Sequence, residues 1–139
     1  MSEYQAPVSQ GKPGKVQAIA IMTLIDGILS ILIGIGWGLG ILGTVVGTFG
    51  VGFFVLLCCP VPIYAVVLGI LEILFAANLL PEPPKVQEFA KYVAIMQIVN
   101  IISGDILSPV TGILALVFAN DPEVVGYFAS VEPQQPTAY

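Results

Sequence analysis

Long apolar stretches, separated by short polar or proline-rich segments, dominate the chain. The 65 residues from Val16 to Leu80 carry only two charges. A helix needs about 20 residues to cross the hydrocarbon core of a bilayer, so this length fits three spans joined by tight turns. We place the turns at the glycine-rich run around Trp37 and at the prolines that follow Cys59. The pattern predicts spans at about 17–37, 39–58 and 62–80.

The segment PEPPK at 81–85 predicts a loop, and a fourth apolar stretch follows it at about 92–119. Pro109 lies inside this stretch, where a proline removes one backbone N–H and frees the carbonyl four residues earlier, at Asp105. We therefore expect a fourth span that is kinked near Pro109.

A short helix is predicted after the fourth span, up to about Ala129. Asp121 suits the N-cap position and Pro122 the first helical position. Because Val124, Val125 and Phe128 are apolar, we expect this helix to lie on the membrane surface. The predicted organisation is a flexible polar tail (1–15), a four-span domain (16–119), and a surface helix with a disordered tail (120–139).

Composition supports a membrane protein and excludes several other classes. Apolar residues make up 57% of the chain and charged residues 9%, whereas a soluble domain carries about 25% charged residues. Four lysines, no arginine and a net charge of −5 exclude a nucleic-acid binder. The chain has no histidine, which excludes histidine-based catalysis and histidine-ligated metals. The predicted fold class is an all-α integral membrane protein, with four transmembrane helices in a compact bundle within the lipid bilayer.

The sequence indicates the orientation of the protein in the membrane less clearly than it indicates the spans. Four crossings place both termini on one side, with Lys12 and Lys15 there and Lys85 and Lys91 on the other. The first helix usually dominates the positive-inside rule, so we expect both termini in the cytoplasm and the protein in the plasma (cytoplasmic) membrane. The same topology places the adjacent Cys58–Cys59 pair on the cytoplasmic side, as free thiols.

Three carboxyl groups fall near the centres of the predicted spans: Asp26, Glu72 and Asp105. A central acid costs roughly 2.5–3.5 kcal/mol to insert, and no predicted span contains a cation to pair with it. Helical spacing places each acid on or beside the small-residue face of its helix, together with Gln97 and Asn100 in the fourth span. Two hypotheses remain open for this set: an interhelical hydrogen-bond clamp of neutral acids, or a proton or monovalent-cation site.

Glycines are concentrated in the second predicted span and the turn before it. They form G-x-x-x-G pairs at 34/38, 36/40 and 43/47, a spacing that lets membrane helices approach closely. We interpret Gly34, Gly38, Gly43 and Gly47 as a helix-packing or subunit interface.

No catalytic, cofactor or metal motif stands beside these packing motifs. The leading functional hypothesis is therefore a non-catalytic structural or assembly component, which self-associates or joins other membrane subunits. The alternative is a small proton or monovalent-cation channel or transporter that uses the midplane carboxyls. We expect no enzymatic activity and no cofactor.

Overall fold

The computed structural model describes residues 11–48, 57–85 and 91–131. It is all-helical, as the sequence predicts: 85% of these residues are helical and none forms a strand. Two of the five α-helices are long and apolar enough to span a membrane. The elements, in chain order, are α1 (Gly14–Gly47), α2 (Pro60–Leu79), α3 (Lys91–Val99), the 3-10 helix η2 (Asn100–Ser103), α4 (Leu107–Ala119) and α5 (Pro122–Val131).

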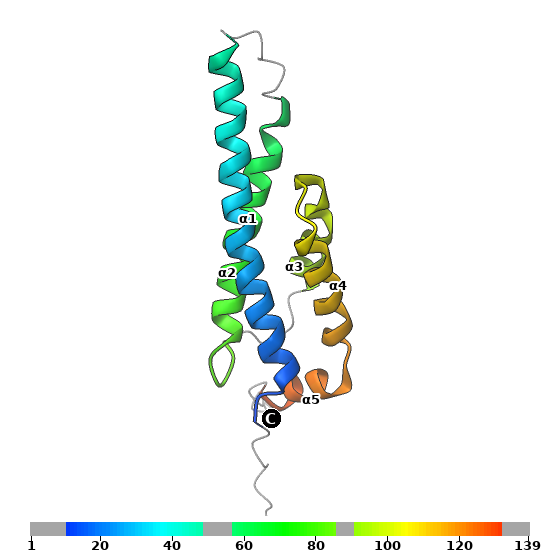
Figure 1. The fold of residues 1–139 in the computed structure, drawn as a ribbon. Coiled ribbons are helices and arrows are strands. Elements are labelled where there is room, and N and C mark those ends of the chain that lie inside the picture. The colour runs from blue at the N-terminus through cyan, green and yellow to red at the C-terminus, as the bar shows by residue number, and fades with distance from the viewer. Residues whose placement is uncertain (1–10, 49–56, 86–90, 132–139) are drawn as a thin grey trace, which may run out of the picture.

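The helices α1 and α2 form a long antiparallel pair (Figure 1). Their backbones touch at glycines. A Cβ atom placed on Gly27 would lie 2.8 Å from the carbonyl oxygen of Gly69, and one on Gly34 would lie 2.9 Å from that of Pro62. No real Cβ makes such contacts, so the pair depends on small residues for its close approach.

The turn expected around Trp37 is absent, because α1 runs without interruption from Gly14 to Gly47. The division into spans at 17–37 and 39–58 is therefore wrong for the described residues: positions 39–47 extend the first helix, and residues 49–56 lie outside the described part. Glycine costs up to about 1 kcal/mol in a helix but keeps its backbone N–H, whereas proline does not. No proline occurs between Gly14 and Cys59, and α2 begins at Pro60, where proline suits the first turn.

The stretch expected to be one kinked span at 92–119 is instead a helical hairpin. The chain rises through α3 and η2, turns between Gly104 and Ile106, and descends through α4 against α3 (Figure 1). Gly104 has a φ of 80°, the left-handed conformation that ends many helices. Pro109 lies in the first turn of α4, where a proline is tolerated, so the break comes earlier than expected and reverses the chain.

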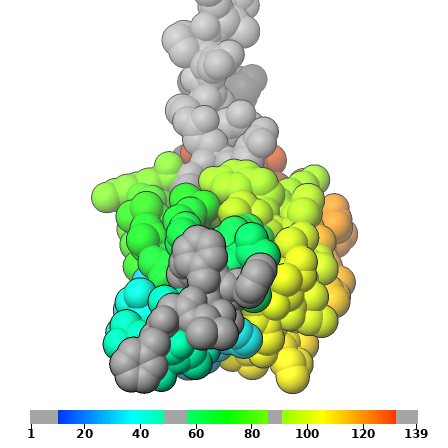
Figure 2. All heavy atoms as spheres, turned by 90° about the horizontal axis from the view of Figure 1, so that it is seen from above, coloured from blue at the N-terminus to red at the C-terminus, as the bar shows by residue number. Residues whose placement is uncertain are grey.

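The short helix α5 begins as predicted, with the carboxylate of Asp121 accepting a hydrogen bond from the backbone N–H of Glu123 (3.0 Å). Its expected location on the membrane surface stays a prediction. Val124, Tyr127 and Phe128 are buried in an apolar core that closes the end of the bundle where α1 begins and α2 ends. Seen from the opposite end, the α1–α2 pair and the hairpin pack side by side (Figure 2).

Candidate buried polar site

Polar side chains are buried where the tip of the α3–α4 hairpin meets the middle of α1 and α2. Each is at most 3% exposed, although the helices around them are apolar. The buried polar site, as we define it, comprises Asp26 and Ser30 of α1, Glu72 of α2, and Gln97, Asn100, Ser103, Asp105 and Ser108 of the hairpin.

Asp105 holds the hairpin tip together and joins it to α1. One carboxylate oxygen accepts hydrogen bonds from the backbone N–H groups of Leu107 (3.0 Å) and Ser108 (3.2 Å), which caps the start of α4. The other accepts from the Ser30 hydroxyl (3.2 Å) and the Asn100 amide (3.4 Å). Asp105 therefore has four donors, three from the hairpin and one from α1.

The second half of the site has fewer donors. The Gln97 amide donates to Oδ2 of Asp26 (3.1 Å), which ties α3 to α1. Oδ1 of Asp26, both carboxylate oxygens of Glu72 and Oγ of Ser108 have no hydrogen-bond partner among the described residues. Glu72 interacts electrostatically with both Asp26 and Asp105, so Asp26 and Glu72, the two acids with unpaired oxygens, are neighbours.

Glycines bring the elements of the site together. A Cβ atom on Gly27 would lie 2.9 Å from Cβ of Glu72, and one on Gly112 would lie 2.9 Å from Cβ of Gln97. The Tyr64 hydroxyl adds a cross-link by donating to the carbonyl of Met96 (2.9 Å). The carboxyl and amide groups are thus fixed by direct backbone contact between helices, which excludes water from their surroundings.

All five polar residues singled out in the sequence lie in this site: Asp26, Glu72, Gln97, Asn100 and Asp105. Sequence reasoning did not select Ser30, Ser103 and Ser108 as site residues. For Ser30 a signal exists, because it lies one helical turn after Asp26 on the same face. Ser103 and Ser108 flank the turn of the hairpin: the Ser103 hydroxyl donates to Oδ1 of Asn100 (2.9 Å), and Ser108 interacts with the Asp26 carboxyl.

The glycines singled out in the sequence divide between two faces of α1. Gly34 contacts α2, and Gly38 lines an apolar groove between α1 and α2. Gly43 and Gly47 face outward, and at each of them a Cβ atom would meet nothing within 4 Å in the described part of the chain. Gly36 and Gly40 have equally open surroundings and share this face at helical spacing. We call Gly36, Gly40, Gly43 and Gly47 the outer glycine face.

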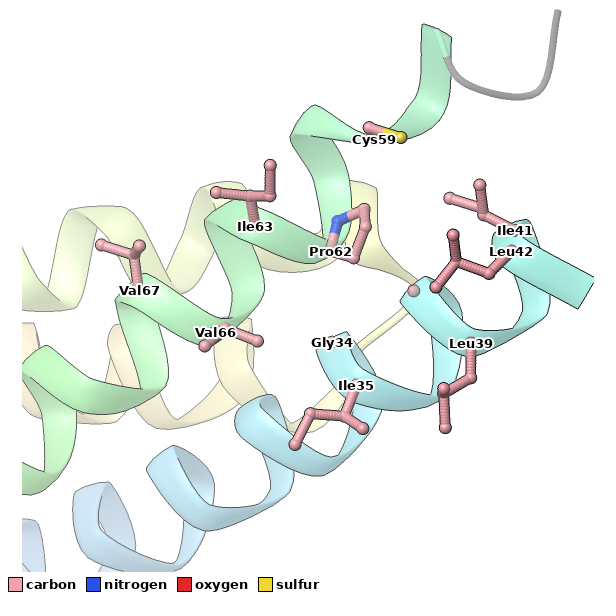
Figure 3. A pocket seen from close by; sticks show the side chains of 11 residues that line it. Gly34, Ile35, Leu39, Ile41, Leu42, Cys59, Pro62, Ile63, Val66 and Val67 are labelled. Atoms are coloured by element: carbon pink, nitrogen blue, oxygen red, sulfur yellow. The ribbon is translucent and has the colours of Figure 1, made fainter. Parts of the chain in front are cut away.

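The apolar groove has a volume of about 480 Å³ and lies between residues 34–42 of α1 and 59–67 of α2. Side chains such as Ile35, Leu39, Ile63 and Val67 line it, with Cys59 near its upper end (Figure 3). It is separate from the buried polar site, because it contains none of the buried acids.

Among the described residues, no group of three or more Cys, Asp or Glu side chains is arranged to hold a metal ion. No protein-family model, curated protein or solved structure matches the chain in any of the three comparisons.

Proposed function

We propose that the chain is an integral membrane protein in which α1 and α2 cross the bilayer. They contain 34 and 20 residues, or about 51 and 30 Å of helix, against a hydrocarbon core of about 30 Å. Each arm of the hairpin has 13 residues, or about 20 Å, too short to cross alone. The hairpin enters and leaves on one side, and its polar tip is buried in protein near the middle of the membrane, which permits irregular backbone there.

The positions of the lysines support an orientation. Lys12 donates to backbone carbonyls at the end of α2, including that of Leu80 (2.9 Å), and Lys15 pairs with Asp121 before α5. Lys85 follows α2 directly, and Lys91 begins α3. Lys12, Lys15 and Lys85 therefore lie at one end of the bundle, and Lys91 begins α3 on the same side of the buried polar site. The positive-inside rule places this end, with both termini, in the cytoplasm.

Within this architecture we propose a non-catalytic assembly role: the chain associates with a second copy of itself through the outer glycine face. The observation that carries this proposal is that, in the described part of the chain, a Cβ atom at any of the four glycines would meet nothing within 4 Å. Their spacing gives two G-x-x-x-G pairs, 36/40 and 43/47, which allow helices to pack backbone to backbone. The face is uncharged, so it suits a self-complementary contact between identical helices.

The test is the mass of the particle extracted from native membranes in a mild detergent, with Gly43→Leu as the variant. A leucine at this position keeps the helices of one chain in place but separates two chains, so the oligomer should dissociate to monomers. Gly126→Leu is the matched control, because Gly126 of α5 also has open surroundings. A wild-type chain that is monomeric in native membranes, or an oligomer that survives Gly43→Leu unchanged, contradicts the proposal.

A second candidate function is proton or monovalent-cation movement through the buried polar site. The observation that favours it is that Oδ1 of Asp26 and both carboxylate oxygens of Glu72 have no hydrogen-bond partner among the described residues, because a purely structural clamp has no need of unpaired buried carboxylate oxygens. The test is ion flux in liposomes that contain the wild type or the Glu72→Gln variant. Equal flux in both, or none above empty liposomes in the wild type, contradicts this candidate.

A further inference from the structure

Most of the side-chain atoms without a hydrogen-bond partner in the buried polar site are carboxylate oxygens. Three of the four, Oδ1 of Asp26 and both oxygens of Glu72, are carboxylate oxygens that only accept hydrogen bonds when ionised. The satisfied acid, Asp105, has four donors. The site therefore lacks hydrogen-bond donors where Asp26 and Glu72 face each other, whereas Asp105 has enough of them.

No cation offsets the charge of the two acids. Both side chains are 0% exposed, and none of the four lysines belongs to the buried polar site. The titratable groups that face the pair are Asp105 from the hairpin tip and Tyr64 from α2 itself, neither of which is a cation. Two adjacent carboxylates in a dry site, with no cation beside them, cannot both stay ionised at a reasonable free-energy cost.

We propose that Asp26 and Glu72 bind one proton between them, carried on Glu72 and donated to Oδ1 of Asp26. A hydronium ion gives one proton to a Glu72 oxygen and leaves as water, so a new O–H bond forms and one negative charge is neutralised. The assignment to Glu72 follows from the donors already present: Asp26 accepts from Gln97, whereas Glu72 accepts from nothing among the described residues.

Two further polar side chains, Ser108 and Gln97, lie beside the pair of acids and support a shared proton there. Oγ of Ser108 is 0% exposed, unpartnered, and interacts with the Asp26 carboxyl, so its hydroxyl is available as a second donor to Asp26 once Glu72 is protonated. The Gln97 amide interacts with both acids and fixes their relative position from α3. A proton requires no space beyond that of its O–H bond, which suits a location where Gly27 lies against Glu72.

This inference deepens the second candidate function, because it names the proton as the ion at the site, yet it is tested without any flux. The measurement is the infrared carbonyl band of a protonated carboxyl, recorded on the full-length chain in liposomes at neutral pH. We expect one such band per chain. It should shift when the chain is made with ¹³C-carboxyl glutamate and stay in place with ¹³C-carboxyl aspartate. Among the described glutamates only Glu72 is buried, whereas Glu82 and Glu123 are exposed.

Variants then locate the proton. Glu72→Gln should remove the band, and the matched control Ser30→Ala, which alters only the Asp105 side of the site, should keep it.

Absence of a protonated-carboxyl band in the wild type overturns the proposal, as does a band that shifts only with labelled aspartate. Loss of the band when choline is replaced by sodium at constant pH overturns it in favour of a sodium site. Isotope labelling needs no variant, so the result stands even if Glu72→Gln fails to fold. A band without flux retains this inference and rejects only transport.

Discussion

At the residue scale, Gly112 shows how one absent side chain determines whether the hairpin closes. A Cβ atom at this position would lie 2.5 Å from the carbonyl oxygen of Ala94 and 2.9 Å from Cβ of Gln97. Backbone cannot yield as a flexible side chain does. We therefore expect Gly112→Ala to push α4 away from α3 and to lower the free energy of unfolding by about 1–3 kcal/mol. Chemical unfolding in detergent, followed by circular dichroism, measures the change.

The control for this prediction is Gly43→Ala, at a glycine with open surroundings. Alanine favours helix over glycine by up to about 1 kcal/mol, so this variant should be as stable as the wild type or slightly more so. Equal losses at both positions would mean that the close contact of Gly112 is not what limits stability.

Asp105 offers a second test at the scale of one side chain. Its carboxylate caps α4 and also accepts from Ser30 and Asn100. Asp105→Ala removes the cap and leaves buried donors unsatisfied, so we expect a loss of about 2 kcal/mol or more in the free energy of unfolding. Asp105→Asn keeps an oxygen that can cap the helix and should lose clearly less. The same unfolding measurement compares the two, and a larger loss for asparagine contradicts the capping role.

At the element scale, Gly104 makes the turn that converts a continuous apolar stretch into a hairpin. Its φ of 80° lies where a side chain is strained, at about 1–2 kcal/mol for an ordinary residue. We expect Gly104→Ala to destabilise the protein by that amount and Gly104→Asn by less, because asparagine tolerates the left-handed conformation better. A Cβ atom here meets nothing within 4 Å, so backbone strain alone is tested. Equal stability of the alanine variant and the wild type would contradict this role.

Element boundaries show which features the sequence encodes locally. Pro60 and the Asp121–Pro122 pair mark helix starts through their own backbone geometry, so the beginnings of α2 and α5 could be predicted. The glycines around Trp37 have no such fixed effect. Glycine can make a turn or continue a helix, and the lack of a nearby proline leaves α1 continuous.

Part of the buried polar site could be predicted from the sequence, because that part also depends on local features of the chain. Depth along a helix follows from residue number, so three acids at mid-span are visible in the sequence. Which donors each acid receives depends on the reversal at Gly104, because this reversal brings Asp105 beside Ser30, 75 positions earlier in the chain, and Ser108 near Asp26. Asp105 and Glu72 differ in the number of hydrogen-bond donors they receive because of that tertiary contact. The spacing of residues along the sequence does not predict this difference.

At the scale of the whole molecule, ion pairs tie the start of α1 to the start of α5. Lys15 contacts Asp121 (2.7 Å) and Glu123 (3.1 Å). The hydrogen bond from Lys15 lowers the pKa of Asp121 below its ordinary value. The stabilisation is therefore complete above the unfolded-state pKa of about 3.9 and is lost as the pH falls through the lower folded-state pKa.

We accordingly expect Lys15→Met to have a lower Tm than the wild type at neutral pH, by a small amount because the pair is exposed. The difference should shrink as the pH falls below about 4, since both chains then lack the Asp121 carboxylate. Thermal unfolding of the two chains across this pH range is the measurement. A Tm difference that does not change with pH would show that the lysine acts through packing of its aliphatic stem.

The continuity of α1 has a consequence for the whole topology. With a turn at Trp37, two crossings would separate the N-terminus from Cys58 and Cys59 and place both on the same side. In the proposed topology, with one continuous helix, a single crossing separates them. The cysteines directly precede α2, at the end opposite the start of α1 (Figure 1). Because Cys58 is exposed and Cys59 partly so, and the chain has no other cysteine, native thiols report the topology directly.

We expect a membrane-impermeant thiol reagent to label the wild-type chain in intact cells. A matched control replaces both native cysteines by alanine and introduces Ala129→Cys in α5, which is exposed at the end that carries the termini. This chain should be labelled only after the cells are opened, because the proposed orientation places that end in the cytoplasm. The reverse labelling pattern would invert the orientation and leave α1 continuous. Labelling of both chains from the same side would instead require an even number of crossings between Cys59 and residue 129. It would contradict the proposed topology, in which α2 crosses once and the α3–α4 hairpin returns to the side it entered from.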